Sequence, residues 1–463
     1  MRSSLLGAAT SPLKPETTGR SLVLMRHGTD GMQAALRTLQ ESAGLATVRM
    51  SDLRDGPHVA DIPTSGAVLL EAIGVAIVNG DPDQIGRLNV QATKSDSILA
   101  VEAERVVYAA TRFSGPEAGI GLPTGAPPPA FAMESINRDY MRGYRDGINH
   151  ATELCFGPVP AAPAARMMPW AAAIDESAVT WGLQATRVVE SPWSGRGIKV
   201  AVLDTGFEVH HPDFADRRVT TQSFVPGETV QDGHGHGTHC VGTALGRRIP
   251  DPLPRYGIAY EAEIFVGKVL SNLGKGADGD IMAGINWAVH NGCRVISMSL
   301  GAPVRARQNP STVFENTARR ALAAGTLIVA AAGNDSHRQN NPPDIWPVEH
   351  PANCPSIMAV AAVDSAMQVA WFSNAGLEPN GGQVNIAGPG VDVYSSWILP
   401  KRYNIISGTS MATPHVAGIA ALHAQANPSI TAVDLWTRLV KSARALGQPP
   451  ADVGSGLVQA PLE

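Results

Sequence analysis

The chain has 463 residues, of which 44% are hydrophobic and 17% charged, and its formal net charge is -5 at pH 7. This composition is typical of a globular protein of two to three domains. The acidic balance argues against a nucleic-acid-binding protein. The four cysteines are widely spaced, which excludes a dense disulfide scaffold and suits a reducing compartment: Cys155, Cys240, Cys293 and Cys354.

The N-terminal sequence contains no apolar core long enough for a signal peptide, and no run of 18 apolar residues occurs in the chain. We therefore expect residues 1–20 to be a flexible leader and the protein to have no membrane partner. The same absence predicts a cytoplasmic protein, with secretion by a signal-independent route as the open alternative.

Residues 21–107 are predicted to form a separate α+β unit. Their order of strand, helix, strand, strand, helix, strand is typical of a ferredoxin-like split βαβ sandwich. The predicted strands and helices follow in chain order: strand 21–26, helix 32–43, strand 46–50, strand 67–79, helix 81–88 and strand 97–108.

Residues 108–178 are predicted to be a linker rich in proline and glycine, with one polar helix possible at 133–154. A connection of this length between two compact units is usually functional or disordered.

From residue 179 to 463 strand-like and helix-like stretches alternate, which predicts an α/β fold with a mostly parallel sheet and helices on both faces. The predicted strands are 198–204, 263–269, 294–299, 326–332 and 356–363. The predicted helices are 237–247, 280–291, 311–324, 409–425 and 431–443. Sites in such sheets lie at the carboxyl ends of strands, where Asp204, Ser299 and Asn334 fall.

Three polar residues in glycine-rich surroundings suggest nucleophilic catalysis. Ser410, in GTSMATPHVAG, begins a helix whose unpaired N–H groups favour negative charge, although such a serine alone is more often a helix cap. His236, in DGHGHGTHCVG, has a side chain that can remove the serine proton near neutral pH. Asp204, in VLDTG, can orient that histidine.

These motifs, in the order Asp, His, Ser, resemble those of the subtilisin-like serine proteases. The resemblance extends from Trp181 to the C-terminus through TWGLQATRV, IKVAVLDTG, HPDF, GKVL, ISMSLG and IVAAAGN. Cys240, directly after His239, is similar to the proteinase K branch. The resemblance implies hydrolysis of peptide or protein substrates through an acyl-enzyme, without an organic cofactor.

Residue by residue, the resemblance assigns Asp204 as the orienting carboxylate, His236 as general base and acid, and Ser410 as nucleophile. Asn334 would stabilise the oxyanion together with the Ser410 backbone N–H. A substrate peptide would add as an extra strand between two segments of the enzyme. The residues implied to bind it are Leu270, Gly276, Ser299, Leu300, Gly301, Ala332 and Gly333.

The resemblance also implies that residues 21–107 are a propeptide that assists folding and then acts as an intramolecular inhibitor. The stretch after Val107 would occupy the cleft, and the cut would fall near 108–113 or near 167–170. His350–Pro351 aligns with a cis-proline bond that lies near the specificity pocket in relatives, so we expect a cis bond here as well. Asp213 matches a calcium ligand in many relatives. The loop that accompanies it there is replaced here by RRIPDPLPRYGIA, which argues against calcium at that position and leaves other positions open.

Other interpretations of the same residues are weaker. Asp-Thr-Gly also occurs in aspartic proteases, but a second such triplet is missing from the sequence. His234, His236 and His239 could suggest zinc, although small residues dominate that run and Asp232 is the one nearby carboxylate. Two functional alternatives stay open on the same fold: a dedicated maturation protease for one partner peptide, and a non-catalytic pseudoprotease that binds peptides.

Overall fold

A computed structural model of the protein describes residues 16–52, 62, 64–94, 96–110, 174–252, 254–305, 307–378 and 381–463. The helix predicted at 133–154 and the candidate cut near 167–170 lie outside these residues. The described parts on either side of 111–173 belong to one structural unit. Within the described residues, no helix combines the length and apolar character needed to cross a bilayer.

Seven parallel strands form the central sheet of the C-terminal part, in the order β14-β13-β12-β10-β6-β8-β7. The apolar runs that predicted five of them are buried, as parallel strands covered on both faces require. The predicted and observed ends of those five agree within two residues, whereas β7 and β14 were not predicted. The strands are β6 (Lys199–Asp204), β7 (Val219–Ser223), β8 (Glu263–Lys268), β10 (Val295–Met298), β12 (Leu327–Ala331), β13 (Met358–Val363) and β14 (Ile386–Pro389).

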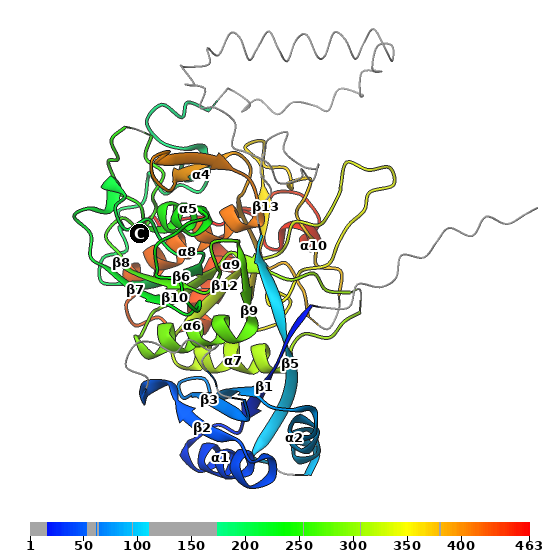
Figure 1. Cartoon of the computed structure of the whole chain (residues 1–463). Coiled ribbons are helices and arrows are strands. Elements are labelled where there is room, and N and C mark those ends of the chain that lie inside the picture. The colour runs from blue at the N-terminus through cyan, green and yellow to red at the C-terminus, as the bar shows by residue number, and fades with distance from the viewer. Residues whose placement is uncertain are drawn as a thin grey trace, which may run out of the picture. The chain divides into compact units, whose positions relative to one another are not determined.

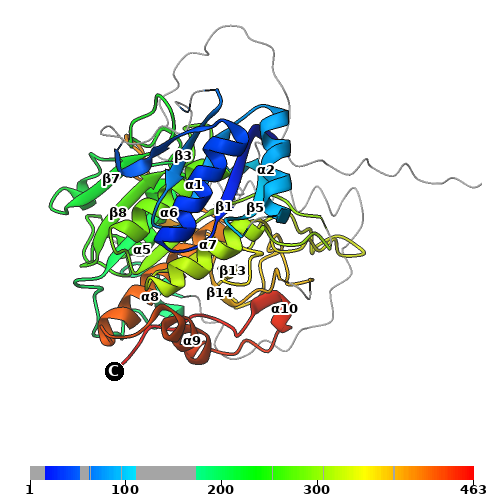
Figure 2. The same cartoon turned by 90° about the horizontal axis from the view of Figure 1, so that it is seen from below.

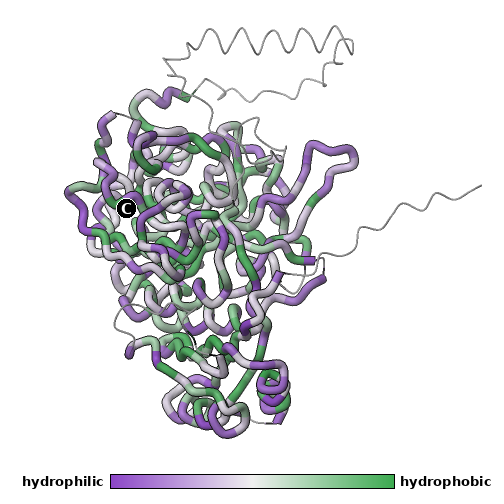
Figure 3. The backbone as a smooth tube through the Cα atoms, in the orientation of Figure 1, coloured by the Kyte–Doolittle hydropathy of each residue, from purple (hydrophilic) through white to green (hydrophobic). Residues whose placement is uncertain are grey.

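Helices cover both faces of this sheet, which confirms the predicted fold class (Figures 1 and 2). One face carries α5 (His236–Leu245) and α8 (Thr409–Ala426), and the other carries α6 (Asp278–His290) and α7 (Thr312–Ala323). Peripheral loops of this part are largely hydrophilic (Figure 3). The remaining helices are α4 (Trp181–Ala185), α9 (Ala432–Ser442) and α10 (Pro450–Val453). A small antiparallel pair joins β15 (Val393–Ser396) and β16 (Tyr403–Ile406).

Helix α8 is buried from Thr409 to Ala424, and it packs unusually close to α5. A Cβ atom placed on Gly418 would lie 2.8 Å from the backbone oxygen of Ala244 in α5, so only glycine fits there without displacement of the helix. Because the two helices approach this closely, the start of α8 and the start of α5 are held in fixed relation.

The N-terminal part has the predicted split βαβ arrangement, with strands in the order β5-β1-β4-β3 and β2 added at the edge. Its own small core lies between this sheet and the two helices. In chain order the elements are β1 (Thr17–Met25), α1 (Thr29–Ala43), β2 (Ala46–Arg49), the 3-10 turn η1 (Met50–Asp52), β3 (Gly66–Leu70), β4 (Val75–Asn79), α2 (Pro82–Lys94) and β5 (Ile98–Ala109).

Two sequence expectations about this part are wrong. The run at 67–79, expected to be one strand, is a hairpin of β3 and β4, because a tight turn at 71–74 reverses the chain at Gly74, where φ is +61°. The leader expected at 1–20 ends earlier, since β1 begins at Thr17 and pairs with β5.

Strand β5 belongs to two sheets at once. Its first half pairs with β1 in the N-terminal sheet. Its second half pairs antiparallel with β9 (Lys275–Ala277) on one side and β11 (Leu300–Gly301) on the other (Figure 1). The end of β5 is therefore the middle strand of a three-stranded arrangement in the C-terminal part.

Two carboxylates of β5 also meet helix N-termini of the C-terminal part. Glu104 is fully buried, accepts the Gly279 N–H at 2.9 Å at the start of α6, and forms an ion pair with Arg20 at 2.6 Å. Glu102 accepts the Thr312 N–H at 2.7 Å at the start of α7. Negative charge is favoured at a helix N-terminus, so both contacts stabilise the association of β5 with this part.

Candidate active site

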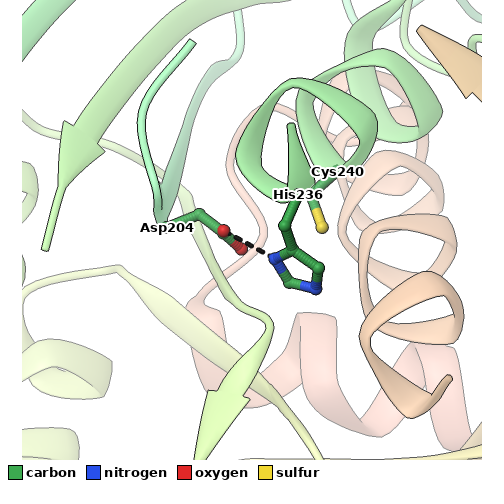
Figure 4. A group of neighbouring side chains, drawn as sticks. All are labelled: Asp204, His236 and Cys240. Atoms are coloured by element: carbon green, nitrogen blue, oxygen red, sulfur yellow. Dashed lines mark hydrogen bonds and ion pairs between the residues drawn. The ribbon is translucent and has the colours of Figure 1, made fainter. Parts of the chain in front are cut away.

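Asp204 and His236 form a buried pair between the end of β6 and the first residue of α5 (Figure 4). His236 Nδ1 lies 2.7 Å from Asp204 Oδ1, and both side chains are fully buried. In a neutral imidazole, an Nδ1–H that donates to the carboxylate leaves Nε2 as an acceptor. Among the described residues His236 Nε2 has no hydrogen-bond partner, so it is free to accept a proton.

Asp232 fixes the loop that delivers His236. Its buried carboxylate accepts the N–H of Thr238 at 2.9 Å and the N–H of Gly235 at 2.9 Å. It also accepts the Thr205 hydroxyl at 3.0 Å, which ties the start of α5 to the residue after Asp204. Asp232 thus has the role of a helix-capping residue and positions the imidazole against the end of β6.

Ser410 is the second residue of α8, as the helix-start prediction requires. Its hydroxyl donates to the backbone oxygen of Ala110 and lies 3.1 Å from the backbone oxygen of Ser299. Ser299 in turn donates its hydroxyl to the Ser410 backbone oxygen at 2.8 Å. The Ser410 hydroxyl is therefore directed at a peptide carbonyl rather than at His236.

Asn334 follows β12 and bridges that strand to the start of α8. Its Oδ1 accepts the Thr409 N–H at 2.9 Å, and its Nδ2 donates to the Ala110 backbone oxygen at 2.6 Å. The first bond fixes the orientation of the amide, so that the second points its N–H groups toward the carbonyl. Ser410 and Asn334 consequently converge on the same oxygen atom.

The residues that lead to this carbonyl lie in an extended strand. Val107 pairs with Gly276, Ala109 with Leu300 and Tyr108 with Gly301. The Ala110 N–H donates to the Ser299 backbone oxygen at 3.3 Å, and the Ala109 N–H donates to the Gly274 backbone oxygen at 2.9 Å. Four of the residues expected to bind a peptide therefore flank the strand that ends at Ala110: Gly276, Ser299, Leu300 and Gly301.

The other three expected substrate-binding residues contact the segments next to β5 through bonds that do not involve β5 itself. Leu270 forms a bridge to Gly276 and so lies one strand further from β5. The backbone oxygen of Ala332 accepts the Glu349 N–H at 3.0 Å. The Gly333 N–H donates to the Thr409 hydroxyl at 3.2 Å, beside the start of α8.

The neighbouring histidines and the cysteine do not compete for the catalytic roles. Burial lowers the pKa of His239 to about 3 and that of His415 to about 4, so both are neutral near pH 7. Burial raises the pKa of the Cys240 thiol well above its ordinary value, which keeps it protonated and unreactive. Cys240 is therefore a buried structural thiol and not a nucleophile.

Donor atoms of Asp204, His236 and Cys240 lie within 4.8 Å of one another, a spacing that a metal ion could use (Figure 4). The Asp204 carboxylate is already hydrogen-bonded to His236 Nδ1 at 2.7 Å, and a metal ion bound between these atoms would have to displace that bond. His239, the other histidine weighed for zinc, bonds through Nε2 to the Val393 backbone oxygen at 3.0 Å. The hydrogen-bonded Asp–His pair is the better account of this group.

Asp213, the calcium candidate, is engaged by two tyrosines. Its carboxylate accepts the hydroxyl of Tyr256 and, at 3.2 Å, that of Tyr403. Calcium needs several oxygen ligands, and its binding here would have to displace these two donors. The surroundings of Asp213 thus favour a hydrogen-bonded role.

Sequence reasoning missed two carboxylates beside Ala110. Asp335 directly follows Asn334, and Glu349 precedes His350–Pro351, whose cis bond confirms the prediction made from the sequence. Both carboxylates line a cavity of about 260 Å³ next to Ala110. Two signals could have pointed to this place: the position of Glu349 directly before His350–Pro351 and the adjacency of Asp335 to Asn334.

An α/β fold in which Ser410 and Asn334 meet one peptide carbonyl, with a buried Asp204–His236 pair at the carboxyl end of a parallel strand, defines a serine peptidase. Known proteins agree, because the family model described as "Subtilase family" matches residues 195–456, more than half of the chain. The chain belongs to the subtilase family and is a subtilisin-like serine endopeptidase.

Individual relatives match the same region. Subtilisin BL of Lederbergia lenta is 40% identical over 286 residues, which are 61% of this chain and 97% of the relative. Subtilisin DY of Bacillus licheniformis is 38% identical over 268 residues, 57% of this chain and 90% of the relative. The solved structure of Sphericase has a TM-score of 0.52 and 33% identity, and the match covers 60% of this chain and 97% of Sphericase.

Proposed function

We propose that this endopeptidase works through an Asp204–His236–Ser410 triad and that it is made as a zymogen, which first cleaves its own bond between Ala110 and Thr111. One observation carries the proposal: the Ala110 carbonyl receives both the Ser410 hydroxyl and the Asn334 amide. A carbonyl in that position is where a peptide bond under attack would lie.

The proposed chemistry starts when the Ser410 hydroxyl turns from the carbonyl oxygen to the free Nε2 of His236. His236 takes the proton as the Ser410 oxygen forms a bond to the Ala110 carbonyl carbon, and Asp204 stabilises the resulting imidazolium. The proton then passes to the leaving nitrogen of Thr111, and the C–N bond breaks. Water, deprotonated by His236, hydrolyses the acyl-enzyme, so the scheme needs no organic cofactor.

Asn334 would stabilise the negative charge that develops on the Ala110 oxygen. Its Nδ2 already lies 2.6 Å from that oxygen, slightly closer than the roughly 2.7–3.1 Å expected for an oxyanion donor. The Ser410 backbone N–H, at the start of α8, is proposed as the second donor. Because Asn334 is anchored to Thr409, little reorganisation of the site accompanies the reaction.

The same geometry supports the inhibitor role of residues 21–107. Residues 106–109 fill the place between β9 and β11 that a substrate strand would take. Of the two regions weighed for the cut, 108–113 contains the carbonyl that lies at Ser410. We therefore propose that the N-terminal part remains bound after cleavage and blocks access by other peptides.

A fluorophosphonate probe tests the assignment of the nucleophile. The processed protein, diluted until its N-terminal part dissociates, is expected to be labelled on Ser410, because only an activated serine reacts with such a probe. Peptide mapping by mass spectrometry would locate the label. Absence of labelling in processed protein would support the pseudoprotease alternative, and a parallel screen of unrelated protein substrates separates a general endopeptidase from a dedicated maturation protease.

Glu104 is expected to hold the N-terminal part in place. In a Ser410→Ala background, which keeps the chain intact, Glu104→Ala should lower the free energy of unfolding by about 2–3 kcal/mol, since it leaves Arg20 and the Gly279 N–H without their buried partner. Urea denaturation measures this value.

Glu102→Ala is the matched control for this substitution. Glu102 also meets a helix N-terminus but is only partly buried, so we expect a loss of about 1 kcal/mol. Equal losses in the free energy of unfolding for the two variants would show that the burial of Glu104 adds no stabilisation beyond that of a partly buried carboxylate at a helix N-terminus.

A further inference from the structure

The cavity beside Ala110 is placed to receive the side chain of the residue that precedes the cleaved bond. Ala110 is that residue, because its carbonyl oxygen meets Ser410 and Asn334. The cavity has a volume of about 260 Å³, far more than a methyl group fills. Its lining consists of the strand end itself and five residues of the enzyme: Gly301, Pro303, Asn334, Asp335 and Glu349.

Glu349 is built into the wall of this cavity. Its backbone N–H donates to the Ala332 oxygen at 3.0 Å, and its backbone oxygen accepts the Asn353 N–H at 2.8 Å. Its side chain lies against two glycines of the peptide-binding segments. A Cβ on Gly301 would be 2.3 Å from Glu349 Oε2, and one on Gly333 would be 2.6 Å from Glu349 Cδ. Glycine at both positions thus leaves the space that the carboxyl group occupies.

The electrostatic environment of Glu349 lacks a compensating cation. The residue is only 6% exposed, and burial raises the pKa of its carboxyl group well above the ordinary value, with a further contribution from the neighbouring Asp335 carboxylate. Within the described part of the chain, neither Glu349 nor Asp335 forms an ion pair with a lysine or arginine. The Glu349 carboxyl group shares a hydrogen bond with the Asp335 side chain and has a backbone hydrogen bond to Asn334, so its partners are a second acid and an amide. Burying two acidic groups together is costly, and a cation brought by a ligand would offset that cost.

We propose that Glu349, assisted by Asp335, makes this cavity selective for a lysine or arginine side chain in the residue before the cleaved bond. The inference rests on the proposed function, since the cavity matters only if Ser410 attacks the carbonyl beside it. A long cationic side chain would reach along the cavity, and its charge-assisted hydrogen bonds to the two carboxylates would be shielded from water. An acidic side chain in the same place is excluded by repulsion.

Ala110 has no cationic side chain that could interact with Glu349 and Asp335 in this cavity. Its methyl group leaves the cavity unfilled, so the N-terminal part is held by the strand pairing of β5 and by Glu104 and Glu102 instead. A substrate with a basic residue would therefore gain interactions that the bound N-terminal part lacks.

Matched peptides test the inference. The processed enzyme is given Val-Tyr-Ala-X amides, which copy residues 107–109, with X as lysine, norleucine or glutamate. We expect kcat/KM for lysine to exceed that for norleucine, its neutral counterpart, by about 10- to 100-fold, the range for a hydrogen bond to a charged group. Glu349→Gln should reduce this ratio to about threefold or less, and Asp335→Asn should reduce it less strongly.

The outcomes separate the selectivity from the peptidase function. If the wild-type ratio of kcat/KM for the lysine peptide to that for the norleucine peptide is one or below, the selectivity inference is wrong. Cleavage of the norleucine peptide in that case would still support the proposed function. No cleavage of any peptide by processed protein that is freed of its N-terminal part, and whose Ser410 reacts with the fluorophosphonate probe in a separate sample, refutes the proposed function itself. A ratio unchanged in Glu349→Gln also overturns the role of Glu349, and fluorophosphonate labelling of that variant shows that its site is folded.

Discussion

Ser410→Ala is expected to leave the chain at its full length of 463 residues, whereas the wild-type chain divides after Ala110. The hydroxyl that this substitution removes is the group that meets the Ala110 carbonyl. Loss of the nucleophile costs about 10⁶-fold in turnover in subtilisin, so self-cleavage should vanish on any practical timescale. Intact-mass spectrometry of both chains, expressed in parallel, gives the result directly.

Ser429→Ala serves as the matched control for this substitution. Ser429 is an exposed serine outside the site, and its hydroxyl donates to Asn427 Oδ1 at 2.9 Å. This variant should be cut like the wild type. Equal processing of Ser410→Ala and wild type would mean that another protease makes the cut, and a mature N-terminus other than Thr111 would show that Ala110 does not mark the cleaved bond.

Asn334→Ala is expected to lower kcat by about 10²–10³ with a much smaller change in KM. That range is the one known for the oxyanion-hole asparagine of subtilisin, and the geometry here gives the same reason for it. The Asn334 amide meets the carbonyl oxygen on which negative charge develops, so its contribution is largest in the transition state. Steady-state kinetics on one peptide amide measures both parameters.

A second variant distinguishes this chemistry from a structural effect. Asn334 also accepts the Thr409 N–H, so its removal could disturb the start of α8. Asn334→Asp keeps an oxygen acceptor for Thr409 but loses the donor, and we expect it to be at least as slow as Asn334→Ala. Asn340→Ala, at an exposed position, is the control. Full activity of Asn334→Asp would rule out the oxyanion role.

Local sequence patterns predicted the central sheet well and the edges poorly. The strand around Val202 is an uninterrupted apolar run, which a buried parallel strand requires. Strand β7 reads VTTQS and is only half-buried at the sheet edge, so it lacks that signal. The hairpin of β3 and β4 was read as one strand because the apolar residues Ala72 and Ile73 occupy its turn.

The same distinction holds for the site. Asp204, His236 and Ser410 stand in motifs that each combine a strand end or helix start with small neighbours, so the residues could be named from the sequence. The contact of Ser410 with Ala110 could be predicted only as far as two candidate ranges, 108–113 and 167–170, because it depends on how two distant parts of the chain pack. Glu349 could not be named, since its role follows from the closeness of Gly301 and Gly333 in space.

The pairing of β5 with both the N-terminal sheet and the C-terminal part has a consequence for how the proposed inhibition depends on concentration. While Ala110 is joined to Thr111, the blocking strand and its groove are on one molecule, and dilution cannot separate them. Once that bond is cut, the two parts are separate molecules that associate reversibly. The proposed inhibition then changes from an intramolecular to a bimolecular equilibrium. A concentrated solution of cut protein should therefore remain inhibited, and its peptidase activity should rise as the solution is diluted.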